Sequence, residues 1–183
     1  MHRILIVAAA AAAMLVWAGT APSVASALDS QLQPVASPIA REVVGFSGGE
    51  APGTIIIRTS ERRLYFVLPD HQALRYGVGV GRPGFTWAGV TRIAYKREWP
   101  DWTPPPQMLR RRPDLPRHMA GGLDNPLGAR AMYLARTLFR IHGSNEPDTI
   151  GHAVSSGCIR MTNDDVIDLY GRARVGARVI VTR

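Results

Sequence analysis

From residue 53 onward the chain alternates between short hydrophobic runs and turn-forming residues, a pattern typical of a protein built mainly of β-strands. Pro69-Asp70 follows the second run and indicates a hairpin. Gly77, Gly79 and Gly81 interrupt the third run and predict a bulge or a close approach of two backbones. The expected strands are residues 54–59, 63–68, 75–81, 86–97, 129–135, 138–141 and 177–182, with a short edge strand at 41–44.

Two helices are expected within this β pattern. Residues 107–112 predict a short middle helix, which follows the proline- and tryptophan-rich segment 99–106. That segment is expected to be a loop, because proline lacks an N–H and restricts the residue before it. The late helix begins after residues 162–165, which supply a capping side chain and first-turn acids, and Gly171 or Gly176 is expected to end it. The sequence therefore predicts a mainly β fold with a short middle helix and one late helix.

The first 52 residues differ in composition from the rest of the chain. A charged start, an apolar run at 4–18 and the small residues 25–27 predict a secretory signal peptide, residues 1–27, cleaved near Ala27. An uncleaved anchor helix is the alternative, but the run is shorter than the ~20 residues of a membrane span, so no stable span is expected after cleavage. Residues 28–52 are expected to be a flexible arm or linker, and 53–183 one domain. The expected location is the periplasm or cell envelope.

The net charge of +8 favours anionic partners through long-range attraction. Export makes nucleic acid a poor candidate, whereas anionic peptidoglycan or a membrane surface fits the expected location. A solvated basic surface that aids solubility is the alternative interpretation. The charge therefore narrows the class of partner without identifying a site.

Cys158 is the only cysteine, so it has no partner for a disulfide within the chain. A small buried hydrophobe is one interpretation of a lone cysteine. The other is a nucleophile, because an imidazole such as that of His142 activates a thiol by removing its proton. Gly143 and Gly157 lie beside these two residues in the sequence, where a missing Cβ lets a substrate approach closely. The suggested chemistry is acyl transfer through a thioester.

Neighbouring residues are candidates for supporting roles. The N–H groups of Ser156, Gly157 and Cys158 are candidate donors to a developing oxyanion. Arg160 is expected either to bind a substrate carboxylate or to brace the loop. His152 is an alternative base. A metal site formed by His142, His152 and Cys158 is disfavoured, because the spacing fits no zinc pattern, and no cofactor or metal is expected.

The residues around the thiol also resemble a known family. His142-Gly143-Ser144-Asn145, Ile150-Gly151 and the run 155–161 are similar to the signature of the L,D-transpeptidase (YkuD-type) catalytic domain of bacterial cell-wall enzymes. Many members carry a second histidine where this chain has Ser156. The resemblance implies a β-sandwich-like catalytic domain. It also implies that the backbone carbonyl of Gly143 orients His142 by accepting a ring N–H.

The function implied by this resemblance is that of an exported peptidoglycan L,D-transpeptidase. Cys158 would form a thioester with a tetrapeptide stem and release the terminal D-alanine. The acyl group would then pass to an amine of another stem peptide, giving a 3-3 cross-link, or of an envelope protein. An L,D-carboxypeptidase that uses water as acceptor and a non-catalytic wall-binding module are the alternatives.

Overall fold

The computed structural model describes residues 22–183, so the apolar run of the expected signal peptide lies outside the described residues. The helices are α1 (Val24–Gln31), α2 (Pro106–Arg111) and α3 (Asn163–Arg172), with a 3-10 turn η1 (Pro147–Thr149). The strands are β1 (Glu42–Gly45), β2 (Ile55–Arg58), β3 (Arg63–Leu68), β4 (Gln72–Gly77), β5 (Val80–Gly81), β6 (Gly89–Glu98), β7 (Arg130–Leu134), β8 (Arg140–His142), β9 (Ala153–Ser155), β10 (Ile159–Arg160) and β11 (Arg178–Thr182). Within residues 22–183, none of the helices has the length and apolar character needed to cross a bilayer.

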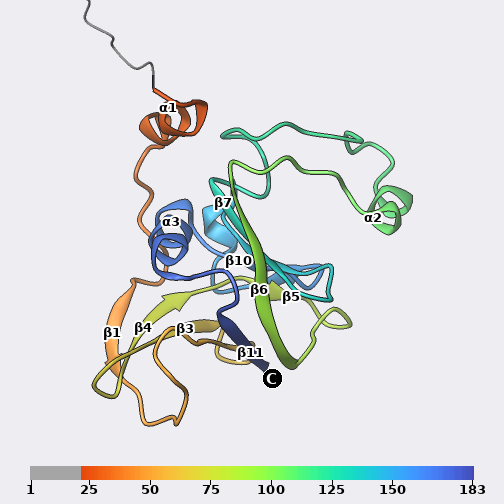
Figure 1. The fold of residues 1–183 in the computed structure, drawn as a ribbon. Coiled ribbons are helices and arrows are strands. Elements are labelled where there is room, and N and C mark those ends of the chain that lie inside the picture. Colours follow the sequence, from red (N-terminus) through yellow and green to blue (C-terminus); the bar gives the residue numbers. More distant parts are fainter. Residues whose placement is uncertain (1–21) are drawn as a thin grey trace, which may run out of the picture.

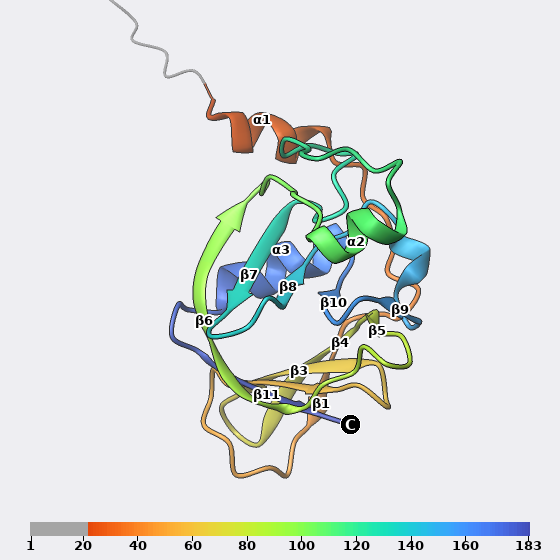
Figure 2. The ribbon, with the colours of Figure 1, turned by 90° about the vertical axis from the view of Figure 1, so that its right-hand side faces the viewer.

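Nine strands form one curled sheet in the order β1-β4-β3-β2-β11-β6-β7-β8-β10. The long strand β6 joins its two halves, because its first residues pair with β11 and its last residues pair with β7. Figures 1 and 2 show β6 curving from one half to the other, with α3 between them. The main core contains Ile57 of one half, Ile141 of the other and Leu169 of α3, all fully buried. The predicted mainly β fold is confirmed.

Most predicted elements are present, with shifted ends. The predicted strand 75–81 is two strands, because the chain leaves β4 at Val78 and Gly79 pairs instead with Arg160 in both directions. The middle helix α2 begins at Pro106, which suits the first helical position because its missing N–H is not needed there. Thr162 caps α3 as predicted, its side chain accepting from the Asp165 N–H.

The predicted end of α3 at Gly171 or Gly176 is wrong. The helix ends at Arg172, and Ala173 follows in an extended conformation while its N–H still donates to the Leu169 carbonyl. Ala173 is 1% exposed and belongs to the core, so packing of this residue, and not a glycine, determines where the chain leaves the helix.

Residues 28–52 contact the rest of the domain at several points. Asp29 of α1, a third helix that the sequence analysis did not predict, accepts hydrogen bonds from Arg130 and Trp99, each at 2.9 Å. Ile39 lies against Gly77 and Gly151, where a Cβ would come within 2.6 Å and 3.0 Å of its side chain. The predicted edge strand is present as β1, which pairs with β4. These partners are far away in the sequence, so the composition of residues 28–52 does not indicate the contacts.

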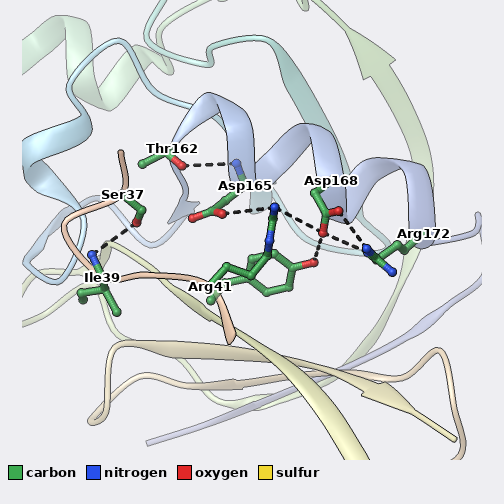
Figure 3. Close-up of polar contacts among 8 residues, drawn as sticks. Ser37, Ile39, Arg41, Thr162, Asp165, Asp168 and Arg172 are labelled. Carbon is green, nitrogen blue, oxygen red and sulfur yellow. Dashed lines mark hydrogen bonds and ion pairs between the residues drawn. The ribbon is translucent and has the colours of Figure 1, made fainter. Parts of the chain in front are cut away.

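Arg41 connects this segment to two acidic residues of α3 (Figure 3). Its Nη1 lies 3.5 Å from Asp165 Oδ1 and 3.4 Å from Asp168 Oδ2. The Tyr76 hydroxyl donates to Asp168 at 2.6 Å. The Asp165 side chain is only 6% exposed, and burial raises the pKa of its carboxyl. Arg41 therefore supplies the positive charge nearest to a desolvated acid.

We expect Arg41→Ala to lower the free energy of unfolding by ~1–2 kcal/mol. Removing one partner leaves a desolvated carboxylate unpaired, and the partial exposure of Arg41 reduces the loss below that of a fully buried pair. Denaturant unfolding, followed by tryptophan fluorescence, measures this change in the free energy of unfolding. The exposed Arg117→Ala is the matched control and should change stability little. Equal losses in the two variants would show that the Arg41 contacts do not stabilise the domain.

Candidate active site

The strands β8 and β10 bring the predicted reacting groups to one face of the sheet. They are parallel neighbours, with Ile159 opposite Ile141 and Arg160 opposite His142. Paired residues on adjacent strands share a face, and side chains alternate along each strand. Ile141 and Ile159 point into the core. His142 and Arg160 therefore lie on the outer face, together with Cys158, the residue directly before β10.

His142 is held in one orientation by the backbone. Its side chain is buried, and its Nδ1 lies 2.6 Å from the Gly143 carbonyl oxygen. A carbonyl only accepts, so Nδ1 carries the hydrogen and a neutral ring leaves Nε2 free to accept a proton. The contact that the resemblance implied is thus present. Gly143 itself donates its N–H to the Arg130 carbonyl at 3.0 Å.

The first turn of α3 explains why residue 143 is glycine. A Cβ at this position would lie 2.3 Å from Asn163 Oδ1, which accepts a hydrogen bond from the Ala129 N–H at 2.9 Å. A side chain at 143 would displace Asn163 and with it the carbonyl that orients His142.

Burial lowers the pKa of His142 to about 3. The positive charge of Arg160 lowers it further, the Gly143 carbonyl opposes the change, and Arg140 adds a smaller decrease. The imidazole is therefore neutral at physiological pH. A neutral imidazole with a free Nε2 is a proton acceptor, which is the form that a general base requires.

This buried histidine predicts a loss of stability in acid. The folded pKa is about 3 and the ordinary value is 6.5, so the unfolded chain binds more protons between these values and stability falls as the pH drops from 6.5 towards 3. Between these two pKa values, the slope of the free energy of unfolding against pH approaches ~1.4 kcal/mol per pH unit. Urea unfolding at several pH values should show a shallower slope for His142→Gln than for the parent. The exposed His152→Gln should keep the parent slope, and equal slopes in all three proteins would contradict a neutral buried His142.

Cys158 is partly buried, and desolvation raises the pKa of its thiol. The charge of Arg140, the Arg140 backbone and the charge of Arg160 act in the opposite direction. The resting thiol is thus protonated, and the imidazole of His142 is neutral. The positive charges of Arg140 and Arg160 would stabilise the negative charge that forms on the sulfur when the proton leaves.

The turn before Cys158 is held by a set of hydrogen bonds. The Ser155 hydroxyl donates to the Cys158 carbonyl at 2.6 Å and accepts from the Gly157 N–H at 3.1 Å. Among the candidate oxyanion donors, the Gly157 N–H is therefore already engaged. The N–H groups of Ser156 and Cys158 make no hydrogen bond within residues 22–183. These two are the available donors.

Two aromatic residues that the sequence analysis did not select support this turn. The Trp87 Nε1–H donates to the Gly157 carbonyl at 2.9 Å, and its ring stacks on Phe139 at 4.9 Å. Gly157 has a φ of 110°, and a Cβ there would lie 2.4 Å from the Phe139 ring. Glycine is thus required both by the backbone conformation and by the ring below it. Neither aromatic residue lies in the motif, so only the fold reveals their role.

The remaining candidates have distinct surroundings. Arg160 Nη1 lies 2.7 Å from Glu146 Oε2, which favours the loop-bracing interpretation. His152 is exposed and lies just before β9, which pairs with β5. Within the described part of the chain, no three His, Cys, Asp or Glu side chains are arranged to hold a metal ion. Arg140, two residues before His142, was not selected from the sequence although its charge acts on both reacting groups.

The curled sheet and its thiol-bearing face are those of an L,D-transpeptidase catalytic domain. Residues 52–181 match the family described as "L,D-transpeptidase catalytic domain" (YkuD), and the chain belongs to this family. It is 40% identical over 134 residues to "Probable L,D-transpeptidase ErfK/SrfK" and 36% identical over 135 residues to "Probable L,D-transpeptidase YcfS", both of Escherichia coli. Each match covers 68% of this chain and 42% of the relative, so the chain spans less than half their length.

Solved structures share the fold. "L,D-transpeptidase from Mycobacterium smegmatis" has a TM-score of 0.57 at 17% identity, covering 71% of this chain and 58% of that one. A Brucella melitensis protein, described as "Probable carnitine operon oxidoreductase caia", has a TM-score of 0.54 at 42% identity, covering 86% of this chain and 99% of that one. The mycobacterial match concerns the fold alone.

Proposed function

We propose that this protein is an exported peptidoglycan L,D-transpeptidase with Cys158 as nucleophile and His142 as general acid and base. The observation that carries the proposal is the orientation of His142, whose Nδ1 is bound by the Gly143 carbonyl on the face shared with Cys158. Family membership supports transpeptidase activity. Export to the periplasm or cell envelope rests on the sequence of the first 27 residues.

The first half-reaction forms a thioester. The Cys158 thiol gives its proton to His142 Nε2 while the sulfur attacks the carbonyl of the L-centre of the diamino acid in a tetrapeptide stem. The Ser156 and Cys158 N–H groups stabilise the oxyanion of the tetrahedral intermediate. The carbon–nitrogen bond then breaks, and the imidazolium protonates the departing amine of D-alanine. The low pKa of His142 makes its imidazolium a strong acid for this step.

The second half-reaction transfers the acyl group. An acceptor amine gives a proton to His142 Nε2 and attacks the thioester carbonyl. Collapse of this intermediate breaks the carbon–sulfur bond, and the proton returns to the Cys158 sulfur. The acceptor is another stem peptide, which gives a 3-3 cross-link, or an envelope protein. With water as acceptor the same site would be an L,D-carboxypeptidase.

Mass spectrometry of muropeptides incubated with the purified protein tests this proposal. A transpeptidase yields dimers joined between diamino acids, a carboxypeptidase yields stems shortened by one alanine, and a wall-binding module leaves them unchanged. Cys158→Ala is the control for contaminating activity. An unchanged muropeptide profile with the parent protein would favour the wall-binding module.

A further inference from the structure

Arg140 occupies a central place beside the reacting groups. It lies two residues before His142 on β8, and the register that pairs Ile159 with Ile141 puts Cys158 next to Arg140 on the neighbouring strand. Adjacent strands are ~4.8 Å apart, so the Arg140 side chain leaves the sheet beside the thiol and on the same face. On its other side Arg140 pairs with Tyr133 of β7.

Aromatic packing holds the Arg140 guanidinium at this place. Its central carbon lies 5.2 Å from the centroid of the Tyr133 ring. Tyr133 in turn stacks on Tyr95 of β6, with 4.2 Å between ring centroids. A guanidinium against an aromatic face is attracted to the ring while its N–H edges stay available. The side chain is thus positioned without using its hydrogen-bond donors.

The charge of Arg140 has no counterion within the described residues. Its neighbour Arg160 pairs with Glu146, whereas no acid in residues 22–183 lies within 4.0 Å of the Arg140 guanidinium. The Arg140 Nε is buried and has no hydrogen-bond partner. Leaving a buried donor unpaired costs ~1–3 kcal/mol, more for a charged group. Such an unpaired cation beside a nucleophile fits an anion that arrives with the substrate.

We propose that Arg140 binds a carboxylate of the acyl donor, close to the bond that Cys158 breaks. This inference rests on the proposed function and adds a specificity-determining residue to it. A carboxylate matches the planar edge of a guanidinium and accepts two hydrogen bonds from it. Binding would neutralise Arg140 and give its buried Nε an acceptor. With a donor that lacks the carboxylate, the charge of Arg140 would stay without a counterion and its Nε without an acceptor.

Two carboxylates of a stem tetrapeptide can belong to the two residues that flank the scissile bond. The terminal carboxylate belongs to the residue directly after the scissile carbonyl, with its Cα ~3.8 Å from that of the diamino acid. The second is the side-chain carboxylate of a diamino acid that carries one. The terminal group would leave with D-alanine, and the side-chain group would stay on the acyl-enzyme. Arg140 would bind either carboxylate through the same hydrogen bonds, so substrates that lack one carboxylate or the other are needed to distinguish them.

Three synthetic donors test the inference with the full-length protein. One has both carboxylates free, one has the terminal carboxylate amidated, and one has the side-chain carboxylate amidated. Arg140→Gln removes the charge and keeps a polar side chain, and exposed Arg136→Gln on the same hairpin is the matched control. Thermal unfolding verifies that each variant is folded.

Arg140→Gln should lower kcat/KM for the free donor by ~10–100-fold, the range for hydrogen bonds to a charged group. One amidated donor lacks the carboxylate that Arg140 binds, and on that donor kcat/KM of the parent and of Arg140→Gln should differ by less than ~2-fold. On the other amidated donor, Arg140→Gln should show the same loss of kcat/KM as on the free donor. Which amide abolishes the difference identifies the carboxylate. Arg136→Gln should match the parent on every donor.

An equal loss on all three donors would overturn carboxylate binding and leave Arg140 a general electrostatic role. No loss on the free donor would remove Arg140 from the site. If the parent turns over none of the donors, the proposed function fails separately. Calorimetric titration of Cys158→Ala with the free donor then decides the inference: weaker binding after adding Arg140→Gln supports it, and unchanged or absent binding refutes it.

Discussion

Cys158→Ser is expected to reduce turnover of a tetrapeptide donor by at least ~10³-fold, because a hydroxyl is far harder to deprotonate than a thiol for the proposed base His142. The fold should be unchanged, since the two side chains differ little in size. Measuring kcat with a chromatographic assay of released D-alanine gives the effect.

Thermal unfolding is the control for the serine variant. Its midpoint should lie close to that of the parent, so that a lost activity reports chemistry and not folding. Turnover within ~10-fold of the parent would remove Cys158 as the nucleophile, because such a loss is too small for a nucleophile of this kind.

His142→Ala should reduce turnover by ~10²–10⁴-fold, the usual contribution of a general acid–base residue. His152→Ala should keep activity within ~2-fold, because that side chain is exposed and the residue lies just before β9, outside both β8 and β10. The same D-alanine assay compares the two alanine variants directly. The reverse order of losses would assign the base to His152.

The sequence predicted the elements whose signals are local. The late helix was found from its capping threonine and first-turn acids, and the structure contains the cap as Thr162. The strands β2, β3, β7 and β11 lie within the predicted runs because their residues are β-branched or apolar. The Gly143 carbonyl contact was implied by the motif, in which the two groups are sequence neighbours.

Features that depend on distant residues were missed. Strands of two or three residues, such as β9 and β10, are too short to show periodicity, so the sequence does not predict them. Trp87 and Phe139 meet beneath Gly157 only because the sheet curls. Arg41 pairs with Asp165 and Asp168, which lie 124 and 127 positions further along the chain. No local pattern encodes such a contact.

Arg140 illustrates the same limit within the site itself. From the sequence it is one arginine in an apolar strand, with nothing to distinguish it from other basic residues. Pairing of β8 with both β7 and β10 places it between Tyr133 and the thiol, with no acid of residues 22–183 paired to it. Strand register, which the sequence did not determine here, therefore decides which charges surround the nucleophile.

The most direct test of Cys158 as the nucleophile is the intact mass of the protein after brief incubation with a tetrapeptide donor and an acid quench. A thioester intermediate predicts a mass increase equal to the donor minus D-alanine, located at Cys158 by peptide mapping and absent from Cys158→Ser. Donor turnover by the parent with no adduct at Cys158, even when acceptor is withheld, or an adduct at any other residue, would contradict it.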